Sequence, residues 1–156
     1  AQVSSNNLII GGQIILEEYT YGAKETNIAK EWSNYLAKSV FPDTNNYWHK
    51  RMQSHLVILP DNEFRDFVRY STEIITRIHI DDVKKTVKKG QLFTQELLPA
   101  DSLLYSFVHV TNSRDGQINA QDVVSKLQDA VGNRLQIGGD ETVGRGRVRL
   151  NWQEVE

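Results

Sequence analysis

The sequence has 156 residues, a formal net charge of −2 and no cysteine, and 39% of its residues are hydrophobic. This composition predicts one globular domain, residues 1–156, and the missing cysteines exclude disulfides, thiolate metal ligands and cysteine nucleophiles. The missing cysteines fit a reducing cytoplasm, where we expect the protein, and no apolar run reaches the ~20 residues that span a bilayer, so no membrane partner is expected. The charge excludes a globally basic nucleic-acid binder, so any RNA would be bound by local patches.

The first half of the chain predicts short strands that alternate with helices. Residues 8–10 and 13–21 are apolar and β-branched around two glycines, which is typical of a bulged strand or of two short strands. Helices are expected from Asn27 to about Lys38, over residues 47–53 and from Asp61 to about Tyr70, with a buried strand at residues 56–59. Two apolar stripes are expected to face the core, namely Ile28, Ala29, Trp32, Tyr35 and Leu36 on the first helix and Phe64, Phe67 and Val68 on the third.

The second half predicts further strands and one amphipathic helix. Strands are expected at residues 75–81, 91–97, 103–110, 135–137 and 148–152, and a helix at residues 120–131 that ends at Gly132. Because strands and helices interleave closely, we expect an α+β fold in which helices pack on one sheet. A ferredoxin-like or RRM-like core is the natural candidate.

Residues 75–98 form a predicted β-hairpin with a basic tip. Its basic residues are Lys84, Lys85, Lys88 and Lys89 at the tip, and Arg77 and His79 on the polar face of the first arm. Lysine contacts phosphate as a point charge, so such a tip could follow a nucleic-acid backbone with little preference among bases. A solvated hairpin that is charged to deter edge-to-edge pairing explains the same residues, and the pattern alone favours this second interpretation.

Residues 137–147 form a glycine-rich turn between two predicted strands. From Gly139 onward the run nearly matches a P-loop, but Arg145 replaces the lysine, Gly146 replaces the hydroxyl ligand, and a strand follows instead of a helix. The dinucleotide-binding fingerprint fails as well, because the third glycine is missing. A tight connection between strands remains one interpretation. Contact of Arg145, Arg147 and Arg149 with a polyanion is the other, although two acidic residues in the turn argue against a simple phosphate cradle.

No self-contained catalytic centre can be identified from the residues. The histidines His49, His55, His79 and His109 lack the spacing of metal ligands, and no G-x-S-x-G nucleophile elbow is present. Asp81 and Asp82 are adjacent in a predicted strand end, where neighbouring side chains face opposite ways. We therefore assign no metal site from the sequence.

Two segments together resemble motifs of one known family. R-I-H-I-D at residues 77–81, followed after a charged stretch by G-Q-L-F-T-Q-E-L-L-P at residues 90–99, is similar to the thumb hairpin of RAMP-superfamily backbone subunits of CRISPR effector complexes. L-Q-I-G-G-D-E-T-V-G-R-G at residues 135–146 resembles the glycine-rich loop of the type III-B (Cmr) subunit. Both motifs occur in the order of the family, and the resemblance covers the C-terminal portion of a typical member.

The resemblance implies a ferredoxin-like palm that carries a projecting thumb. Copies of such a subunit stack along a CRISPR guide RNA with other effector subunits in antiviral defence, and target RNA paired with the guide is cut in a reaction that uses a divalent metal such as magnesium. RNA contacts are implied for matched or nearby residues of the two motifs: Arg77, His79, Lys84, Lys85, Lys88, Lys89, Gly138, Gly139, Thr142, Gly144, Arg145 and Arg147.

The sequence also departs from this family. The catalytic aspartate of the family lies in an N-terminal half that has no recognisable match here, so its role passes to no residue of this chain. Glu96, which stands at the matched glutamate, is either an auxiliary catalytic group or a salt-bridged residue at the base of the thumb. We expect the other half to have been removed, to be a separate chain or to belong to a longer fusion.

Two other functions are compatible with the residues. The chain could be a structural piece of an effector complex that contacts neighbouring subunits and not the RNA. A stand-alone RRM-like binder of single-stranded RNA fits less well, because the aromatic pattern that stacks bases in that family is missing. Salt dependence of RNA binding separates the first alternative from the guide-binding function.

Overall fold

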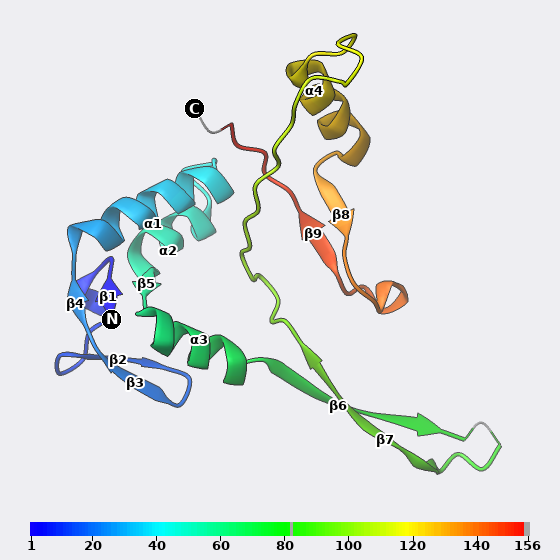
Figure 1. Ribbon diagram of the computed structural model, residues 1–156. Helices are drawn as coiled ribbons and strands as arrows, with labels where there is room; N and C mark the ends of the chain where they lie inside the picture. Colours follow the sequence, from blue (N-terminus) through cyan, green and yellow to red (C-terminus); the bar gives the residue numbers. More distant parts are fainter. Residues whose placement is uncertain (82, 155–156) are drawn as a thin grey trace.

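The computed structural model describes residues 1–81 and 83–154, and for Lys88 and Lys89 it describes the backbone alone. Over this part of the chain the fold is α+β, as predicted, with α-helices and several small sheets (Figure 1). The expectation of one sheet covered by helices is wrong, because the strands of the described residues form four separate sheets. None of the helices in the described ranges is long and apolar enough to cross a membrane.

The N-terminal part contains a three-stranded sheet and a hairpin. Strand β1 (Gln2–Val3) lies between β4 (Lys24–Glu25), which is parallel to it, and β5 (Val57–Ile58), which is antiparallel. Strands β2 (Gln13–Leu16) and β3 (Tyr19–Gly22) pair with each other. The strand expected at residues 8–10 does not form: Leu8 belongs to the 3₁₀ turn η1 (Asn6–Leu8), and Ile10 makes an isolated bridge to Gln13. The Ser5 hydroxyl accepts a hydrogen bond from the Asn7 amide and caps η1.

Helix α1 (Asn27–Val40) packs on α2 (Tyr47–His55). The buried side chains of α1 are small, namely Ala29, Ser33 and Ala37, which recur every four residues. Of the stripe that was expected to face the core, Ala29 is buried, whereas Trp32 and Tyr35 are 52% and 56% exposed. The N-cap is Thr26, one residue before the expected one, because its hydroxyl accepts the Ala29 amide hydrogen bond.

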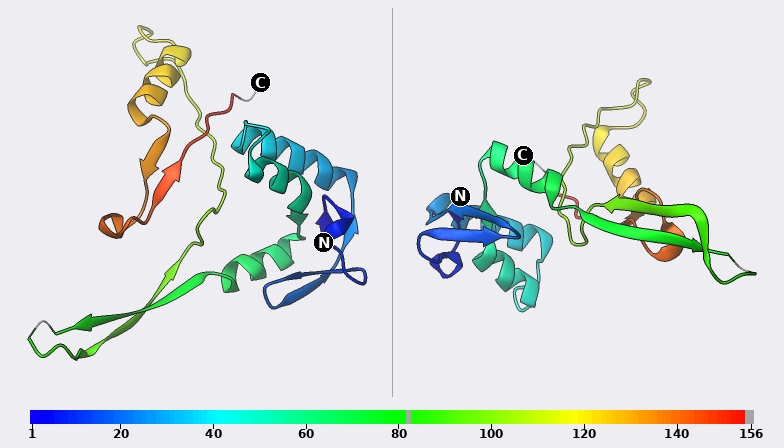
Figure 2. Two further views of the ribbon diagram at one scale, coloured as in Figure 1. Left: turned by 180° about the vertical axis from the view of Figure 1, so that it is seen from behind. Right: turned by 90° about the horizontal axis from the view of Figure 1, so that it is seen from below.

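A long hairpin follows α3 (Asp61–Tyr70) and projects from the rest of the molecule. It consists of β6 (Glu73–Ile80) and β7 (Val87–Leu97), which pair antiparallel with a register shift between Ile78 and Ile80. Figures 1 and 2 show its far end extending well away from the other elements. β7 begins four residues before the start predicted from the pattern, so the loop of the hairpin is shorter than expected.

The C-terminal part returns toward the N-terminal helices. An irregular extended segment leads to α4 (Ala120–Val131), and β8 (Arg134–Gln136) then pairs with β9 (Arg147–Arg149) around the 3₁₀ turn η2 (Glu141–Val143). The side chain of Arg149 donates to the Val40 carbonyl at 2.9 Å and stacks over Phe41. This arginine therefore contacts the end of α1.

The strand expected at residues 103–110 does not form. The backbone is extended, but none of its N–H or C=O groups is paired with backbone elsewhere in the described residues. Leu104, Tyr105 and Phe107 are 72%, 87% and 81% exposed. A strand needs a neighbour for its hydrogen bonds, and in this part of the molecule no strand lies beside it. The buried apolar side chains are few: Val3, Ile14, Ala29 and Ala37.

Candidate nucleic-acid interface

The glycine-rich loop lies against the base of the hairpin, and Asp140 joins the two. The Oδ2 atom of Asp140 accepts a hydrogen bond from Nε2 of Gln95 at 2.7 Å and one from the guanidinium of Arg77 at 3.3 Å. Nε of Arg145, in the loop itself, lies 3.9 Å from the same oxygen. Arg77 and Gln95 share one face of the hairpin, because Arg77 is opposite Phe93 and Gln95 is opposite Ile75. One carboxylate thus connects residues of both motifs.

The backbone of the loop has a defined shape. Asp140 is in the left-handed region with a φ of 61°, and its carbonyl oxygen accepts from the amides of Val143 at 3.1 Å and Arg145 at 3.2 Å. The Ile137 amide donates to the carbonyl of Gly146 at 2.9 Å, which closes the loop across its base. Gly146 has a φ of 69°, and a Cβ there would collide with the carbonyl oxygen of Ile137. This glycine is therefore required by the structure.

The outer surface of the loop consists of small, exposed residues. Those predicted to contact RNA are Gly138, Gly139, Thr142 and Gly144, and all four are exposed. Because small side chains leave backbone N–H groups accessible, this surface is suited to close approach by phosphate oxygens. Arg147 is also exposed, whereas the side chains of Arg77 and Arg145 are each only 31% exposed and face Asp140.

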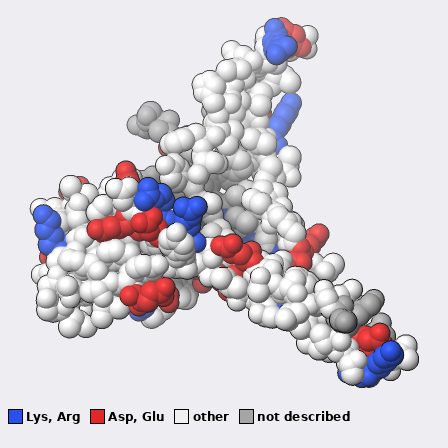
Figure 3. All heavy atoms as spheres, turned by 60° about the horizontal axis from the view of Figure 1, so that its bottom comes forward, with Lys and Arg blue, Asp and Glu red and all other residues white. Residues whose placement is uncertain are grey.

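The basic tip of the hairpin is folded around Asp81. Its Oδ1 atom accepts hydrogen bonds from the amides of Val83 at 3.0 Å and Lys84 at 2.8 Å, and its own amide donates to the Thr86 carbonyl at 2.9 Å. Lys84 and Lys85 are exposed, and Figure 3 shows basic (blue) and acidic (red) side chains together at the far end of the arm. The side chains of Lys88 and Lys89, which were also predicted to bind RNA, lie outside the described residues. His79 is exposed along the first strand.

Glu96 lies on the opposite face of the hairpin from Arg77 and Gln95. It is paired across the ladder with Ile74, and its Oε1 accepts a hydrogen bond from the Thr72 hydroxyl at 2.7 Å. The structure therefore does not bring Glu96 together with the glycine-rich loop. Among the described ion pairs it has no cationic partner, so the salt bridge considered for it is replaced by a neutral hydroxyl.

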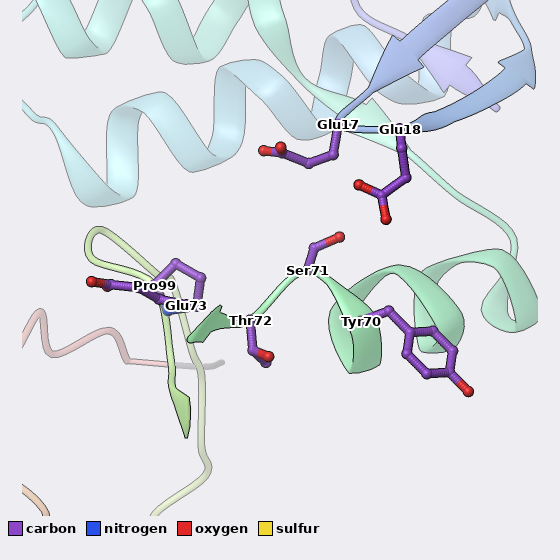
Figure 4. Close-up of a pocket in the computed structure, with 7 residues that line it drawn as sticks. All are labelled: Glu17, Glu18, Tyr70, Ser71, Thr72, Glu73 and Pro99. Atoms are coloured by element: carbon purple, nitrogen blue, oxygen red, sulfur yellow. The ribbon is translucent and has the colours of Figure 1, made fainter. Parts of the chain in front are cut away.

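A cavity of about 360 Å³ lies beside Thr72, between the β2–β3 turn and the junction of α3 with β6. Figure 4 shows Glu18 and Ser71 pointing toward one another across it. Glu17, Glu18 and Glu73 contribute carboxylates to its lining. Like charges repel, so this acidic cavity disfavours the phosphate backbone of RNA.

The divalent metal that the family resemblance implies stays a prediction, and its ligands are not identified among the described residues. Across residues 1–81 and 83–154, no three side chains of the histidine, cysteine, aspartate or glutamate type come together in a group that could hold an ion. A magnesium site can consist of one or two carboxylates together with substrate oxygens and water, which this observation does not address. We assign no metal ligand to a residue of this chain.

Asp140 and Gln95 are the residues that sequence reasoning missed. The two acidic residues of the loop were taken as an argument against binding a polyanion, because their charge was counted without partners. The structure shows that one of the two compensates two arginines. A signal was present in the sequence, since an acidic residue that directly follows two glycines in an arginine-rich loop is a candidate to fix those arginines.

Comparisons with known proteins identify one family and two curated relatives. A family model described as the RAMP superfamily matches residues 3–149. The CRISPR system Cmr endoribonuclease Cmr4 of Pyrococcus furiosus is 33% identical over 98% of this chain and 51% of its own length. The CRISPR system CMR subunit Cmr4 of Saccharolobus solfataricus is 29% identical over 95% of this chain and 50% of its own length. The chain therefore spans about half the length of the curated relatives it matches.

The fold is similar to that of a solved structure as well. The crystal structure of Pyrococcus furiosus Cmr4 matches with a TM-score of 0.52 and 20% sequence identity. The match covers 97% of this chain and 53% of the chain in that structure. At this level of identity the similarity concerns the fold.

Proposed function

The chain belongs to the RAMP superfamily, and from this membership we propose that it is a guide-RNA-binding backbone subunit of a type III-B (Cmr) CRISPR effector complex. The proposal includes several copies stacked along one guide, neighbouring effector subunits, and target RNA that pairs with the guide. It also includes a cytoplasmic location, where guide and target would meet.

The observation that carries the proposal is the contact between the two motifs. Residues 77–81 with 90–99 and residues 135–146 are distant in sequence, and each was singled out for a different reason. In the fold they adjoin at Asp140, which accepts hydrogen bonds from Arg77 and Gln95. Exposed loop glycines and an exposed arginine, Arg147, lie beside this junction. A surface of this kind supports binding to phosphates with little dependence on base sequence.

The proposed contributions of the residues follow from their placement. Exposed amides near Gly138 and Gly139 would donate hydrogen bonds to phosphate oxygens, and Arg147 would add a charge-assisted contact. Lys84 and Lys85, at the far end of the hairpin, would attract the RNA backbone as point charges. The face that carries Glu96 and the acidic cavity would remain turned away from the guide.

Cleavage of target RNA is proposed for the whole family protein. One curated relative has the word endoribonuclease in its name, and this chain matches half of it. Glu96 remains a proposed auxiliary group, which would act on RNA only if a strand of the target passed over the face opposite Arg77. The proposed divalent metal would supply Lewis-acid chemistry, and we assign its ligands to no residue of this chain.

The experiment that tests the proposal is a filter-binding titration of the chain against single-stranded CRISPR guide RNA at several salt concentrations. Binding to phosphates releases counterions, so we expect the affinity to fall steeply as salt is added. The double variant Lys84→Glu/Lys85→Glu should lose affinity by about tenfold or more, and the loss should be the same for every RNA sequence tested. The control Lys24→Glu/Lys126→Glu makes the same change in net charge on exposed lysines away from the hairpin.

Equal losses in the two double variants would show that net charge alone governs binding and would contradict a role for the hairpin. Absence of salt-dependent binding by the unchanged chain would contradict the proposal itself. In that case the alternative function, an assembly piece without RNA contact, gains support. A specific observation favours it: the apolar residues Leu104, Tyr105 and Phe107 are exposed, as residues that pack against a neighbouring polypeptide would be.

A further inference from the structure

We infer that Asp140 is a positioning residue, which holds the glycine-rich loop against the base of the hairpin in the arrangement that binds RNA. The inference rests on the proposed function, because the arrangement matters only if RNA crosses both elements. It assigns to an acidic residue a favourable role in binding a polyanion, through the cations and amides that the carboxylate holds in place.

Asp140 provides the direct connection between the two elements. Among the hydrogen bonds of the described residues, those that link the hairpin to residues 137–147 run from Gln95 and Arg77 to Oδ2 of Asp140. They join residues 45 and 63 positions apart in the sequence. Loss of this one oxygen would therefore leave the loop without a polar attachment to the hairpin.

The carboxylate of Asp140 determines the orientation of the Gln95 side-chain amide. Its amide nitrogen donates to Asp140, while its Oε1 atom is buried without a hydrogen-bond partner. A buried acceptor without a donor is unfavourable. Reversing the amide would place Oε1 against the carboxylate, which is worse because two acceptors would face each other. The interaction with Asp140 therefore determines how the Gln95 side chain lies.

The same residue also shapes the loop through its backbone. The carbonyl of Asp140 accepts from the amides of Val143 and Arg145, and its left-handed φ of 61° turns the chain into η2. The exposed residues Gly138, Gly139, Thr142 and Gly144 lie on both sides of this turn. Side chain and backbone of Asp140 thus act together: one attaches the loop, and the other presents its amides.

The charge of Asp140 provides a test in which the two possible effects have opposite signs. By Coulomb repulsion alone, removing a negative charge beside the site should strengthen binding of RNA. If Asp140 is a positioning residue, removing its charge should weaken binding although the net charge becomes more favourable. Asp140→Asn makes this change while tolerating the left-handed backbone, since asparagine adopts that conformation more readily than most residues.

The matched control is Glu141→Gln. Glu141 is the exposed neighbour of Asp140, its side chain makes none of the hydrogen bonds found in the described residues, and its substitution changes the net charge equally. Titrations of the full chain with guide RNA at several salt concentrations should show Asp140→Asn binding about tenfold more weakly, within the range for coupled side chains. Glu141→Gln should bind as tightly as the unchanged chain or more tightly.

A second variant tests whether the attachment between residues 95 and 140 supports binding. Asp140→Asn/Gln95→Glu exchanges the donor and the acceptor across the junction and keeps the net charge of the unchanged chain. The new carboxylate would stand on the strand beside Arg77, so the attachment can re-form with reversed polarity. We expect this variant to recover most of the affinity and the salt slope that Asp140→Asn loses. Urea unfolding of each variant shows whether the affinity follows stability: a variant that keeps the unfolding free energy of the unchanged chain and still binds weakly has lost positioning.

The outcomes are distinct. Weaker binding by Asp140→Asn, unchanged or tighter binding by Glu141→Gln, and recovery by the double variant support the inference. Equal or tighter binding by Asp140→Asn overturns it, while the proposed function stands. If Asp140→Asn does not fold by circular dichroism, the double variant decides: a folded double variant with weak binding overturns the inference. Absence of binding by the unchanged chain overturns the proposed function, and the inference with it.

Discussion

Gly146 shows how a single backbone position sets the shape of the candidate interface. Its φ is 69°, and any Cβ would meet the carbonyl oxygen of Ile137. Ile137 also closes the loop, because its amide donates a hydrogen bond to the carbonyl of Gly146. Neither the strain nor the collision can be relieved by moving a flexible side chain, because the obstacle is backbone.

We therefore predict that Gly146→Ala destabilises the protein by about 1–3 kcal/mol through backbone strain. Urea unfolding followed by circular dichroism measures the loss. The matched control is Gly139→Ala in the same loop, where a Cβ would meet nothing within 4 Å and the backbone is outside the left-handed region. That change should alter the free energy of unfolding by less than about 0.5 kcal/mol. Equal losses at both glycines would show that the loop has a different conformation in solution.

Glu25 gives a second prediction at the residue scale, on the pH dependence of stability. The ammonium group of Lys30 and then the Asn6 amide, at 2.7 Å, donate to its carboxylate, and both hold the pKa of Glu25 below its ordinary value of 4.5. In the unfolded chain these donors are gone and the pKa returns to its ordinary value. A depressed pKa in the folded state stabilises the protein above the unfolded pKa, and this contribution is lost as the pH falls through the folded one.

Glu25→Gln should therefore lower the thermal midpoint at pH 7, and the difference from the unchanged chain should shrink as the pH is lowered below about 4.5. Thermal unfolding between pH 3 and pH 7 measures it. Glu31→Gln serves as the control, because Glu31 is exposed on α1 and accepts none of the hydrogen bonds found in the described residues. A constant difference across this range for Glu25→Gln would mean that the carboxylate does not make these contacts in solution.

At the scale of elements, helices were predicted well because their signals are local. α4 begins and ends where expected, since Asn119 accepts the Asp122 amide hydrogen bond at 2.8 Å and Gly132 follows the last turn with a φ of 68°. The helix at Asp61–Tyr70 was predicted with equal accuracy. The arms of the hairpin were also visible, because alternation on either side of a polar turn depends on neighbouring residues.

Predictions that depend on distant partners failed. The expected inward face of α1 included Ala29, which is buried, together with Trp32 and Tyr35, which are exposed. The other buried residues are Ser33 and Ala37, and periodicity does not say which of two adjacent faces finds a partner. Contacts across 45 and 63 positions, which join Asp140 to Gln95 and Arg77, have no local signature either. The two motifs of the candidate interface were identified from sequence, but the residue that connects them was not.

Residues 103–110 give a prediction for one element. Their pattern is that of a strand, yet their backbone lacks backbone partners in the described part of the chain. We predict that the amides of Tyr105, Phe107 and Val108 exchange with solvent at nearly unprotected rates in the isolated chain, whereas amides within α4 are protected. Hydrogen exchange followed by mass spectrometry measures both in one experiment. Protection of this segment equal to that of α4 would mean that it pairs with a strand in solution.

At the scale of the whole molecule, the exposed surface is too large for a compact domain. The chain exposes 12760 Å², whereas a compact protein of its mass exposes about 8,000 Å². The difference arises from the projecting hairpin, the extended segment and a C-terminal part that contacts the rest at few points (Figures 1 and 2). Under the proposed function, other polypeptide or RNA would cover part of this surface.

This surface predicts how the isolated chain responds to urea. The unfolded chain exposes about 26,000 Å², so unfolding uncovers about 13,000 Å² instead of the roughly 18,000 Å² of a compact domain of equal mass. The dependence of the unfolding free energy on urea, the m-value, scales with the area uncovered. We expect an m-value about a quarter below that of a compact domain of this length, with the same value from tryptophan fluorescence and from circular dichroism. An m-value equal to that of a compact domain, at every protein concentration, would mean that the hairpin or the extended segment folds back onto the chain in solution. An m-value that rises with protein concentration would mean instead that copies of the chain cover one another's exposed surfaces.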